Sequence, residues 1–265
     1  MSREWQKAAS PLADGDPSPV EIINPAGASS FLLLGDHAGN IVPARLGMLG
    51  VAQIDLSRHI GWDIGVGTLG AKLAGALDAV FVRQTYSRLV IDCNRDPAAP
   101  DAIAAISDGT VVPGNAGLSQ AARDQRCAAI HTPYHAAIAA ELARRDAAGQ
   151  ATIIVSLHSF TPVMGGVARP WEIGVLYADG DDRFARAMLD VLRAEPGLTV
   201  GDNQPYRMDS TDHTVPLHAF AARRPYAELE IRQDLLGSDA GCARWCELLR
   251  RILPASLPIQ DRMAI

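Results

Sequence analysis

Polar residues that can do chemistry follow four of the apolar, strand-like runs in this sequence. The four groups are Asp36-His37-Ala38-Gly39-Asn40, Asp92-Cys93-Asn94-Arg95-Asp96, His158-Ser159, and the trio Glu228, Glu230 and Arg232. In parallel α/β sheets, ligands bind beyond the carboxyl ends of the strands, so we expect the four groups to share one site. Imidazoles and carboxylates are zinc ligands, and a catalytic zinc site keeps one position for water. These residue types therefore suit a metal-dependent hydrolytic site.

These residues indicate a metal site because they occur together. A single histidine at a strand end is usually structural, and Asp63 before a helix-like run reads by itself as an N-cap. Glu230 is harder to explain in that way, because Leu229 and Ile231 flank it and a buried carboxylate must be paired, neutral or functional. Arg88, which also lies in an apolar run, raises the same question.

A competing motif points to a different class of protein. The stretch GVGTLG, residues 65–70, satisfies the GxGxxG fingerprint of dinucleotide-binding proteins, and Asp92 lies at roughly the expected distance downstream. That fingerprint should directly follow a buried strand, yet the preceding IDLSRHIGWD is polar. Small glycines that allow close packing of a helix on a sheet explain the same pattern, so an oxidoreductase is the weaker interpretation.

Strand-like and helix-like runs alternate along the chain, which predicts an α/β fold with a mostly parallel sheet. The predicted strands lie in 29–37, 79–94 (strand, bend, strand), 151–160, 169–178 and 224–236, and the predicted helices are 65–78, 119–149, 181–195 and 241–253. Residues 1–25 are rich in Pro and Asp and are expected to form a mobile tail, which leaves 26–265 as a single domain. Residues 98–118 read as an irregular insertion of the kind that forms lids or binding loops.

Composition excludes several partners. The chain has 265 residues, of which 24 are Lys or Arg and 30 are Asp or Glu, and the formal net charge is −6. We expect no nucleic-acid partner, because no basic block stands out. We also expect no membrane span and no secretory signal, because no apolar run approaches about 20 residues and the first thirty residues are polar. The four cysteines form no CxxC pair, which favours reduced thiols and a cytoplasmic protein.

Eight stretches between about residue 31 and 236 resemble one known family. They are DHAGNIVP, RHIGWDIG, YSRLVIDCNRDP, TPYHAAI, LHSFTPVMGG, RPWEIGVLY, GDNQPY and ELEIRQDL. In these stretches the sequence resembles the N-formylglutamate amidohydrolases, specifically the shorter predicted-amidohydrolase branch. That family is in turn similar to zinc carboxypeptidases and the aspartoacylase group. The resemblance implies a single domain with a mixed, mostly parallel sheet sandwiched between helices, zinc carboxypeptidase-like, and one catalytic zinc ion.

The resemblance also implies a ligand set. His37 matches the first histidine of the related enzymes and His158 the last, and Asp63 opens a helix as their acidic ligand does. Asn40 stands where the HxxE spacing of those enzymes has glutamate, so Asn40 is the alternative second ligand. Their catalytic glutamate matches Glu230.

The substrate-binding residues follow from the same resemblance. Arg88 is expected near the scissile carbonyl, and Asn94 and Arg95 at the substrate carboxylate. Arg169 and Arg232 are candidates for a second, side-chain carboxylate, and their alternative is an ordinary surface or interstrand ion pair.

Four further histidines have no assigned role. His131 and His135 lie four residues apart, a spacing that could hold a metal, but Pro133 between them and the family pattern favour a structural role. His213 and His218 belong to a loop region that could close over substrate.

The implied reaction is hydrolysis of a small anionic N-acyl amino acid, nominally N-formyl-L-glutamate to formate and L-glutamate. The alternatives are a deacylase or peptidase for another N-acyl amino acid, and a metal-free binding protein. A site of histidines and carboxylates also accepts Mn, Co or Fe in place of Zn.

Overall fold

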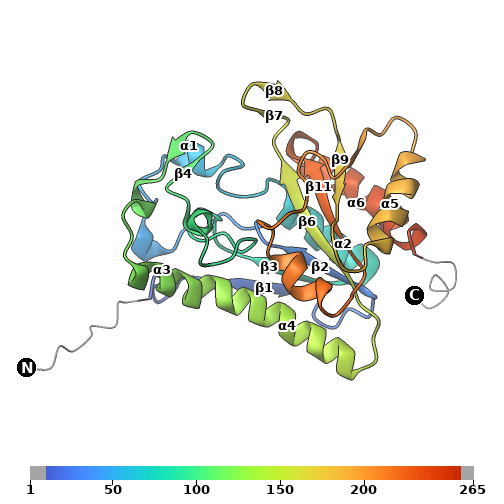
Figure 1. Cartoon of the computed structure of the whole chain (residues 1–265), viewed down its shortest axis with the longest axis horizontal. Helices are drawn as coiled ribbons and strands as arrows, with labels where there is room; N and C mark the ends of the chain where they lie inside the picture. Colours follow the sequence, from blue (N-terminus) through green and yellow to red (C-terminus); the bar gives the residue numbers. More distant parts are fainter. Residues whose placement is uncertain (1–9, 258–265) are drawn as a thin grey trace, which may run out of the picture.

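A seven-stranded sheet forms the centre of the protein in the computed structural model, which describes residues 10–257 (Figure 1). The strand order is β1-β3-β2-β6-β11-β9-β10. The strands are β1 (Val20–Ile23), β2 (Phe31–Gly35), β3 (Val80–Gln84), β6 (Ile153–Phe160), β9 (Ile173–Leu176), β10 (Val200–Asp202) and β11 (Tyr226–Arg232). Four central strands, β3, β2, β6 and β11, run parallel to one another. The pair β9 and β10 is also parallel. The pairings of β1 with β3 and of β9 with β11 are antiparallel. The predicted mixed, mostly parallel sheet of a single domain is therefore confirmed.

Helices cover both faces of this sheet. Helix α4 (Thr132–Ala147) crosses one face, and α2 (Val66–Leu77), α5 (Arg183–Arg193) and α6 (Asp239–Ala255) pack on the other (Figure 1). Every residue of β2 and β6 is buried, as expected for strands that are covered on both sides. Within the described residues, none of the helices has the length and apolarity that a membrane span requires.

The predicted second strand within 79–94 is wrong. β3 ends at Gln84, and the apolar residues that follow form buried turns, held by hydrogen bonds such as that from the Val90 amide to the Ser87 carbonyl. The Asp92 amide donates instead to Ala102, in the insertion. A short apolar run reports burial, and burial does not distinguish a strand from a packed turn.

The predicted helix over 119–149 is interrupted. It consists of α3 (Gln120–Arg126), a π turn (Cys127–His131) and α4. Ser119 caps α3 as expected, accepting a hydrogen bond from the amide of Ala122. Pro133 has no backbone N–H to donate to the carbonyl four residues earlier, and the helix widens into the π turn just before it.

Short elements surround the sheet. They are η1 (Ala44–Leu46), α1 (Gln53–Leu56), η2 (Pro100–Ile103), β4 (Ile106–Ser107), β5 (Thr110–Val111), η3 (Pro113–Asn115), β7 (Val163–Met164), β8 (Val167–Ala168), the π turn η5 (Pro216–Phe220) and η6 (Gln233–Leu235). The insertion over 98–118 therefore holds a small hairpin, β4–β5. Part of the expected N-terminal tail differs from the prediction, because Val20–Ile23 forms the edge strand β1; residues 1–9 lie outside the described part of the chain.

Candidate functional site

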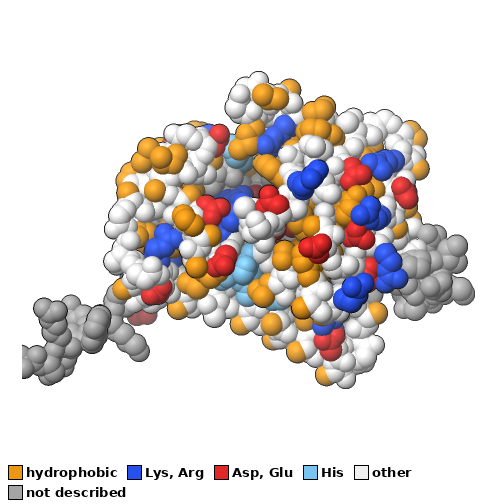
Figure 2. All heavy atoms as spheres, viewed as in Figure 1, with side chains coloured by type: hydrophobic (Ala, Val, Ile, Leu, Met, Phe, Trp, Pro, Cys, Tyr) orange, Lys and Arg blue, Asp and Glu red, His pale blue; other side chains and the backbone are white. Residues whose placement is uncertain are grey.

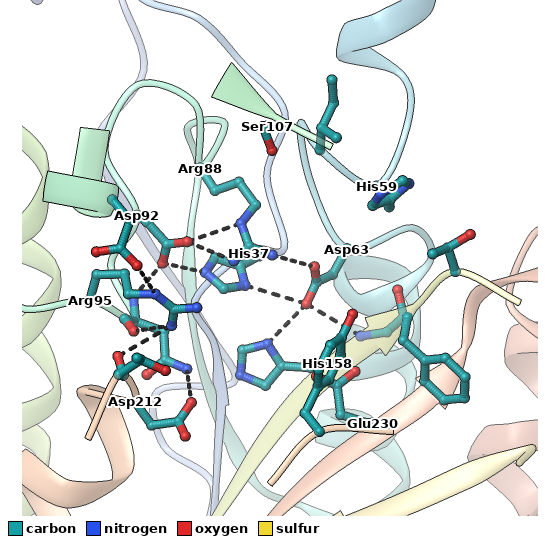
Figure 3. Close-up of a pocket in the computed structure, with 18 of the residues that line it drawn as sticks. His37, His59, Asp63, Arg88, Asp92, Arg95, Ser107, His158, Asp212 and Glu230 are labelled. Atoms are coloured by element: carbon teal, nitrogen blue, oxygen red, sulfur yellow. Dashed lines mark hydrogen bonds and ion pairs between the residues drawn. The ribbon is translucent and has the colours of Figure 1, made fainter. Parts of the chain in front are cut away.

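A pocket of about 650 Å³ opens beyond the carboxyl ends of β2, β6 and β11. In Figure 2 it appears as a hollow below the β7–β8 hairpin, with acidic and basic side chains at its rim. The strand ends and the insertion both contribute to its lining, with His37, His158 and Glu230 from the strand side and Ser107 and Asp108 from the insertion (Figure 3). The pocket thus lies at the sheet edge that the sequence predicts.

His37, Asp63 and His158 converge at the floor of this pocket. One ligand atom from each lies within 4.8 Å of the other two, although the residues come from three separate segments. Asp63 Oδ2 is 2.9 Å from His158 Nδ1 and 3.4 Å from His37 Nδ1. The amide of Asp63 donates to the carbonyl of His37, which ties the two segments together. Asp63 is not the N-cap of α2, because that position is held by Gly65.

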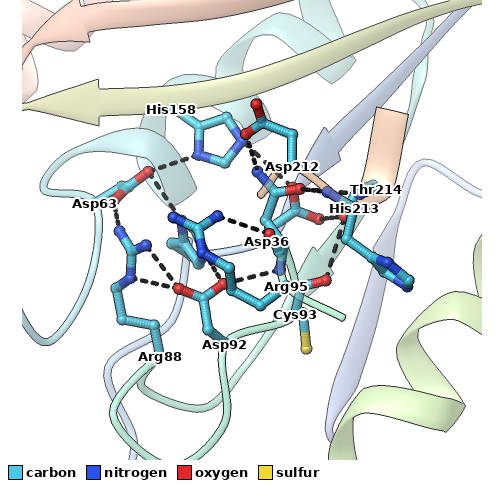
Figure 4. A network of polar contacts seen from close by, with 12 residues as sticks. Asp36, Asp63, Arg88, Asp92, Cys93, Arg95, His158, Asp212, His213 and Thr214 are labelled. Carbon is cyan, nitrogen blue, oxygen red and sulfur yellow. Dashed lines mark hydrogen bonds and ion pairs between the residues drawn. The ribbon is translucent and has the colours of Figure 1, made fainter. Parts of the chain in front are cut away.

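Each of the two histidines contacts a second carboxylate on its far side, Asp92 for His37 (Figure 3) and Asp36 for His158 (Figure 4). His37 Nε2 is 2.7 Å from Asp92 Oδ1, and His158 Nε2 is 3.3 Å from Asp36 Oδ2. In this structure His158 Nδ1 donates to Asp63, because a carboxylate only accepts. With a metal ion between the rings and Asp63, the Nε2 contacts would keep the protons on Nε2 and leave both Nδ1 lone pairs for the ion. A carboxylate behind a histidine is the usual second layer of a zinc site. Within residues 10–257, His37 Nδ1 is buried and makes no hydrogen bond, so the donor set fits a divalent metal ion.

The electrostatics of this group favour a cation. Burial alone would raise the pKa of Asp63, but the neighbouring His37 and His158 lower it below its usual range. For His158, burial disfavours the charged ring, yet its hydrogen bonds to Asp36 and Asp63 raise the pKa well above the ordinary value. Three buried carboxylates therefore act on two imidazoles. A metal ion supplies the compensating charge without requiring the rings to be protonated.

Arg88 borders the same group. Its Nη2 and Nε atoms donate to Asp92 Oδ2 at 2.6 and 3.0 Å, and its Nη1 lies 3.5 Å from Asp63 Oδ1. Burial disfavours the charged guanidinium and lowers the pKa of Arg88. The opposite effect of Asp92 and Asp63 is greater, so that the pKa lies above its ordinary value. The Arg88 side chain is one-quarter exposed, and the exposed part faces the pocket. A fixed cation at this place can bind a carbonyl oxygen or an oxyanion.

Glu230 stands on β11 opposite His158 on β6. Its carboxyl group lines the pocket, and its Oε2 atom is buried without a hydrogen-bond partner in the described part of the chain. Burial raises the pKa of Glu230 to about 7. A carboxyl group with that pKa can accept and return a proton near neutral pH.

The structure places Asn94 and Arg95 in the pocket lining as well. The Asn94 side chain accepts hydrogen bonds from the amides of His213 and Thr214, which fixes the loop. Arg95 donates to Asp101 at 3.0 Å and to two backbone carbonyls. Arg95 therefore remains available to a substrate only through part of its guanidinium.

Two predicted substrate residues lie outside the lining, within the part of the chain that the structure describes. Arg232 pairs with Asp234 at 2.8 Å, which is the ordinary ion pair that the sequence left open as an alternative. Arg169 donates to the hydroxyl of Tyr206, itself a lining residue, at 2.8 Å. Asn40 is not among the lining residues either, and its side-chain amide donates to the carbonyl of Leu56.

The glycine-rich stretch has a packing role. A Cβ atom at Gly70 would lie 2.3 Å from the ring of Phe81, and one at Gly67 would lie 2.8 Å from Arg83 Nη1. These glycines let α2 approach β3, and the stretch is separated from the preceding strand, β2, by some thirty residues. The dinucleotide interpretation therefore has no structural support.

Sequence reasoning placed Asp92 and Glu228 at the strand ends without giving them a role, and it did not single out Tyr206 or Asp212. Asp92 holds both His37 and Arg88, and its only signal was a place after an apolar run. Glu228, Tyr206 and Asp212 also line the pocket. Tyr206 and Asp212 come from the irregular segment between β10 and β11 that folds over the sheet edge, and the only local signal for them is that Tyr206 ends the GDNQPY stretch.

The fold and the pocket define an α/β protein whose histidines, carboxylates and arginines meet beyond the strand ends. The family model for N-formylglutamate amidohydrolase matches residues 29–236, and the chain belongs to this family. No match is found among curated proteins.

Two solved structures are similar over nearly the whole chain. A gene product from Agrobacterium tumefaciens is 35% identical, with a TM-score of 0.89, over 92% of this chain and 97% of that one. The N-formylglutamate amidohydrolase from Ralstonia eutropha JMP134 is 21% identical, with a TM-score of 0.65, over 94% of this chain and all of that one. The second likeness shows a shared fold.

Proposed function

We propose that this protein is a zinc-dependent amidohydrolase that removes the acyl group from an N-acyl amino acid, nominally converting N-formyl-L-glutamate to formate and L-glutamate. The observation that carries this proposal is the convergence of His37, Asp63 and His158 in the same pocket as Glu230, whose buried Oε2 atom has no hydrogen-bond partner among the described residues. Membership of the amidohydrolase family supports the reaction class. The four free cysteines suit the reducing cytoplasm in which we place the protein.

His37 and His158, through Nδ1, and Asp63, through a carboxylate oxygen, are the residues that would hold the metal ion. The chemistry that zinc would supply in such a site is a lowering of the pKa of its bound water to about 7 and the polarisation of a carbonyl group. Asp92 and Asp36 keep the two imidazoles in the tautomer that presents Nδ1.

Glu230 is the proton carrier in this proposal. It accepts the proton of the attacking water and then returns it to the amine that leaves when the C–N bond breaks. Arg88 donates hydrogen bonds to the oxygen on which negative charge develops, and loss of one such donor typically costs about 10²–10³ in rate.

Arg95 would bind the substrate carboxylate, assisted by Asn94. A guanidinium can hold a carboxylate through two parallel hydrogen bonds, which a lysine cannot do. Arg169 is the candidate for a second carboxylate, because it lies against Tyr206 at the pocket wall.

The proposal is tested with His37→Ala and His158→Ala, measuring zinc by elemental analysis and formate release from N-formyl-L-glutamate. Each variant should lose one equivalent of zinc and its turnover, with secondary structure retained. His59→Ala is the matched control, because His59 lines the pocket but pairs only with Asp108 among the carboxylates. Full zinc retention in both variants would refute the ligand assignment, and a panel of N-acetyl, N-succinyl and dipeptide substrates separates the alternative deacylases and peptidases.

A further inference from the structure

A second group of histidines lies behind the pocket, between α4 and the segment that enters η5. It consists of His131, His135, His213 and His218, none of which lines the pocket within the described residues. His131 and His135 are buried, and the other two are partly exposed. Figure 2 shows histidine side chains gathered at the surface just above α4. We call these four residues the histidine cluster.

The rings of the cluster are packed against one another. One ring nitrogen from each of His131, His135 and His213 lies within 4.8 Å of the other two. The ring centroids of His131 and His135 are 4.4 Å apart, and His213 lies 5.3 and 5.1 Å from them. His218 Nε2 is 3.0 Å from His135 Nδ1. Four imidazoles from two distant segments thus share one small volume.

Backbone carbonyls orient the two buried rings. His135 Nε2 lies 2.9 Å from the carbonyl oxygen of Cys93, and His131 Nε2 lies 3.1 Å from that of Arg95. A carbonyl oxygen only accepts, so both Nε2 atoms carry the proton and both Nδ1 atoms carry a lone pair. This is the arrangement that metal-bound histidines usually show, with one nitrogen held by a backbone carbonyl and the other facing the ion.

The rings are also in the protonation state that a metal requires. Burial lowers the pKa of all four imidazoles, to about 3 for His135 and to about 4 for His218. Neutral rings offer lone pairs at physiological pH, so none of the four rings has to lose a net proton when an ion binds.

We propose that His131, His135 and His213, with His218 as the fourth ligand, form a second divalent-metal site that is structural and takes zinc. Two nitrogens bound to one tetrahedral zinc lie roughly 3.3 Å apart, given Zn–N bonds of about 2.0–2.1 Å. The 3.0 Å contact of His135 with His218 already has this size, and small ring rotations close the remaining spacings. On binding, the Nε2 proton of His218 moves to its Nδ1. A set of imidazoles alone selects Zn, Cu or Ni over Mg or Ca.

A metal at this place would brace the active-site loops. The amides of His213 and Thr214 donate to Asn94 Oδ1, and Thr214 Oγ1 donates to Asp36 at 2.9 Å (Figure 4). Asp36 in turn contacts His158. The cluster therefore joins α4 to the chain segments behind the pocket, and the four-nitrogen set leaves no open position for substrate.

The test uses the full chain, stripped with a chelator and titrated with Zn²⁺ or Co²⁺. The wild type should bind two equivalents, and the variant His37→Ala/His158→Ala should keep one, with a visible Co²⁺ spectrum typical of tetrahedral coordination. Adding His213→Ala should remove that last equivalent and its spectrum. Adding His59→Ala instead should leave both unchanged.

The outcomes separate this proposal from the proposed function. If the pocket holds no metal, the wild type binds one equivalent, which His213→Ala removes and His37→Ala does not. If the cluster holds none, His37→Ala/His158→Ala binds nothing, and the proposal is overturned. A folded triple variant that still binds one equivalent, or a weak octahedral Co²⁺ spectrum, overturns it as well. Folding is checked by circular dichroism. In the His37→Ala/His158→Ala background, added Zn²⁺ should raise the melting temperature only while His213 is present.

Discussion

Replacing Glu230 with Gln should reveal two separate consequences of its buried position on β11. The substitution keeps the size of the side chain and removes its ability to ionise. In the metal-loaded enzyme, loss of the proton carrier should lower kcat by about 10²–10⁴ while the zinc content stays unchanged. In the metal-free protein, the same change should alter how stability depends on pH.

The size of the stability effect follows from the pKa of Glu230. Burial raises that pKa from 4.5 to about 7, and each pKa unit corresponds to about 1.4 kcal/mol, so the rise corresponds to about 3 kcal/mol. The folded state holds the proton more tightly than the unfolded chain. The stabilising contribution is therefore complete below pH 4.5 and is lost as the pH rises through about 7. Above that range, Glu230→Gln should be more stable than the wild type.

Urea unfolding of chelator-treated protein at several pH values between 5 and 8 measures this difference, with formate release as the kinetic assay. Asp190→Asn is the control, because it removes a carboxylate from an exposed position on α5 and should leave both measurements unchanged. Equal pH dependence of unfolding in Glu230→Gln and wild type, together with near-normal kcat, would refute the reasoning on both counts.

Three further predictions concern Asp92 and Arg95 at the pocket and the buried Arg145 on α4. Asp92→Asn should weaken zinc binding about 10–100-fold, because Asp92 orients His37, and chelator competition measures it; unchanged affinity would contradict that role. Arg95→Ala should raise KM for anionic substrates more than it lowers kcat, and equal KM values would place the carboxylate elsewhere. Arg145→Ala should destabilise the protein by about 3–5 kcal/mol in urea unfolding, because Arg145 is fully buried and pairs with Glu141; a loss below about 1 kcal/mol would show that the pair is dispensable.

Much of the fold was predictable because its signals are local. The apolar run of β2 and the mostly apolar run of β6 indicate strands buried on both faces, and the alternation of strands and helices indicates a parallel sheet. The turns after β3 and the π turn before Pro133 were not predicted. Apolar content indicates that a segment is buried, but it does not specify the backbone conformation.

The sequence by itself determined which residue types stand at the strand ends, and therefore that His37, His158 and Glu230 would reach the same edge of the sheet. It also supplied the family resemblance that singled out Asp63. Only the tertiary structure brought Asp63 together with His37 and His158, put Arg232 outside the pocket lining and gathered the histidine cluster. Side-chain type and strand periodicity can be read from neighbouring residues. Contacts between residues some 80 positions apart, such as His131 and His213, form only when the whole chain folds.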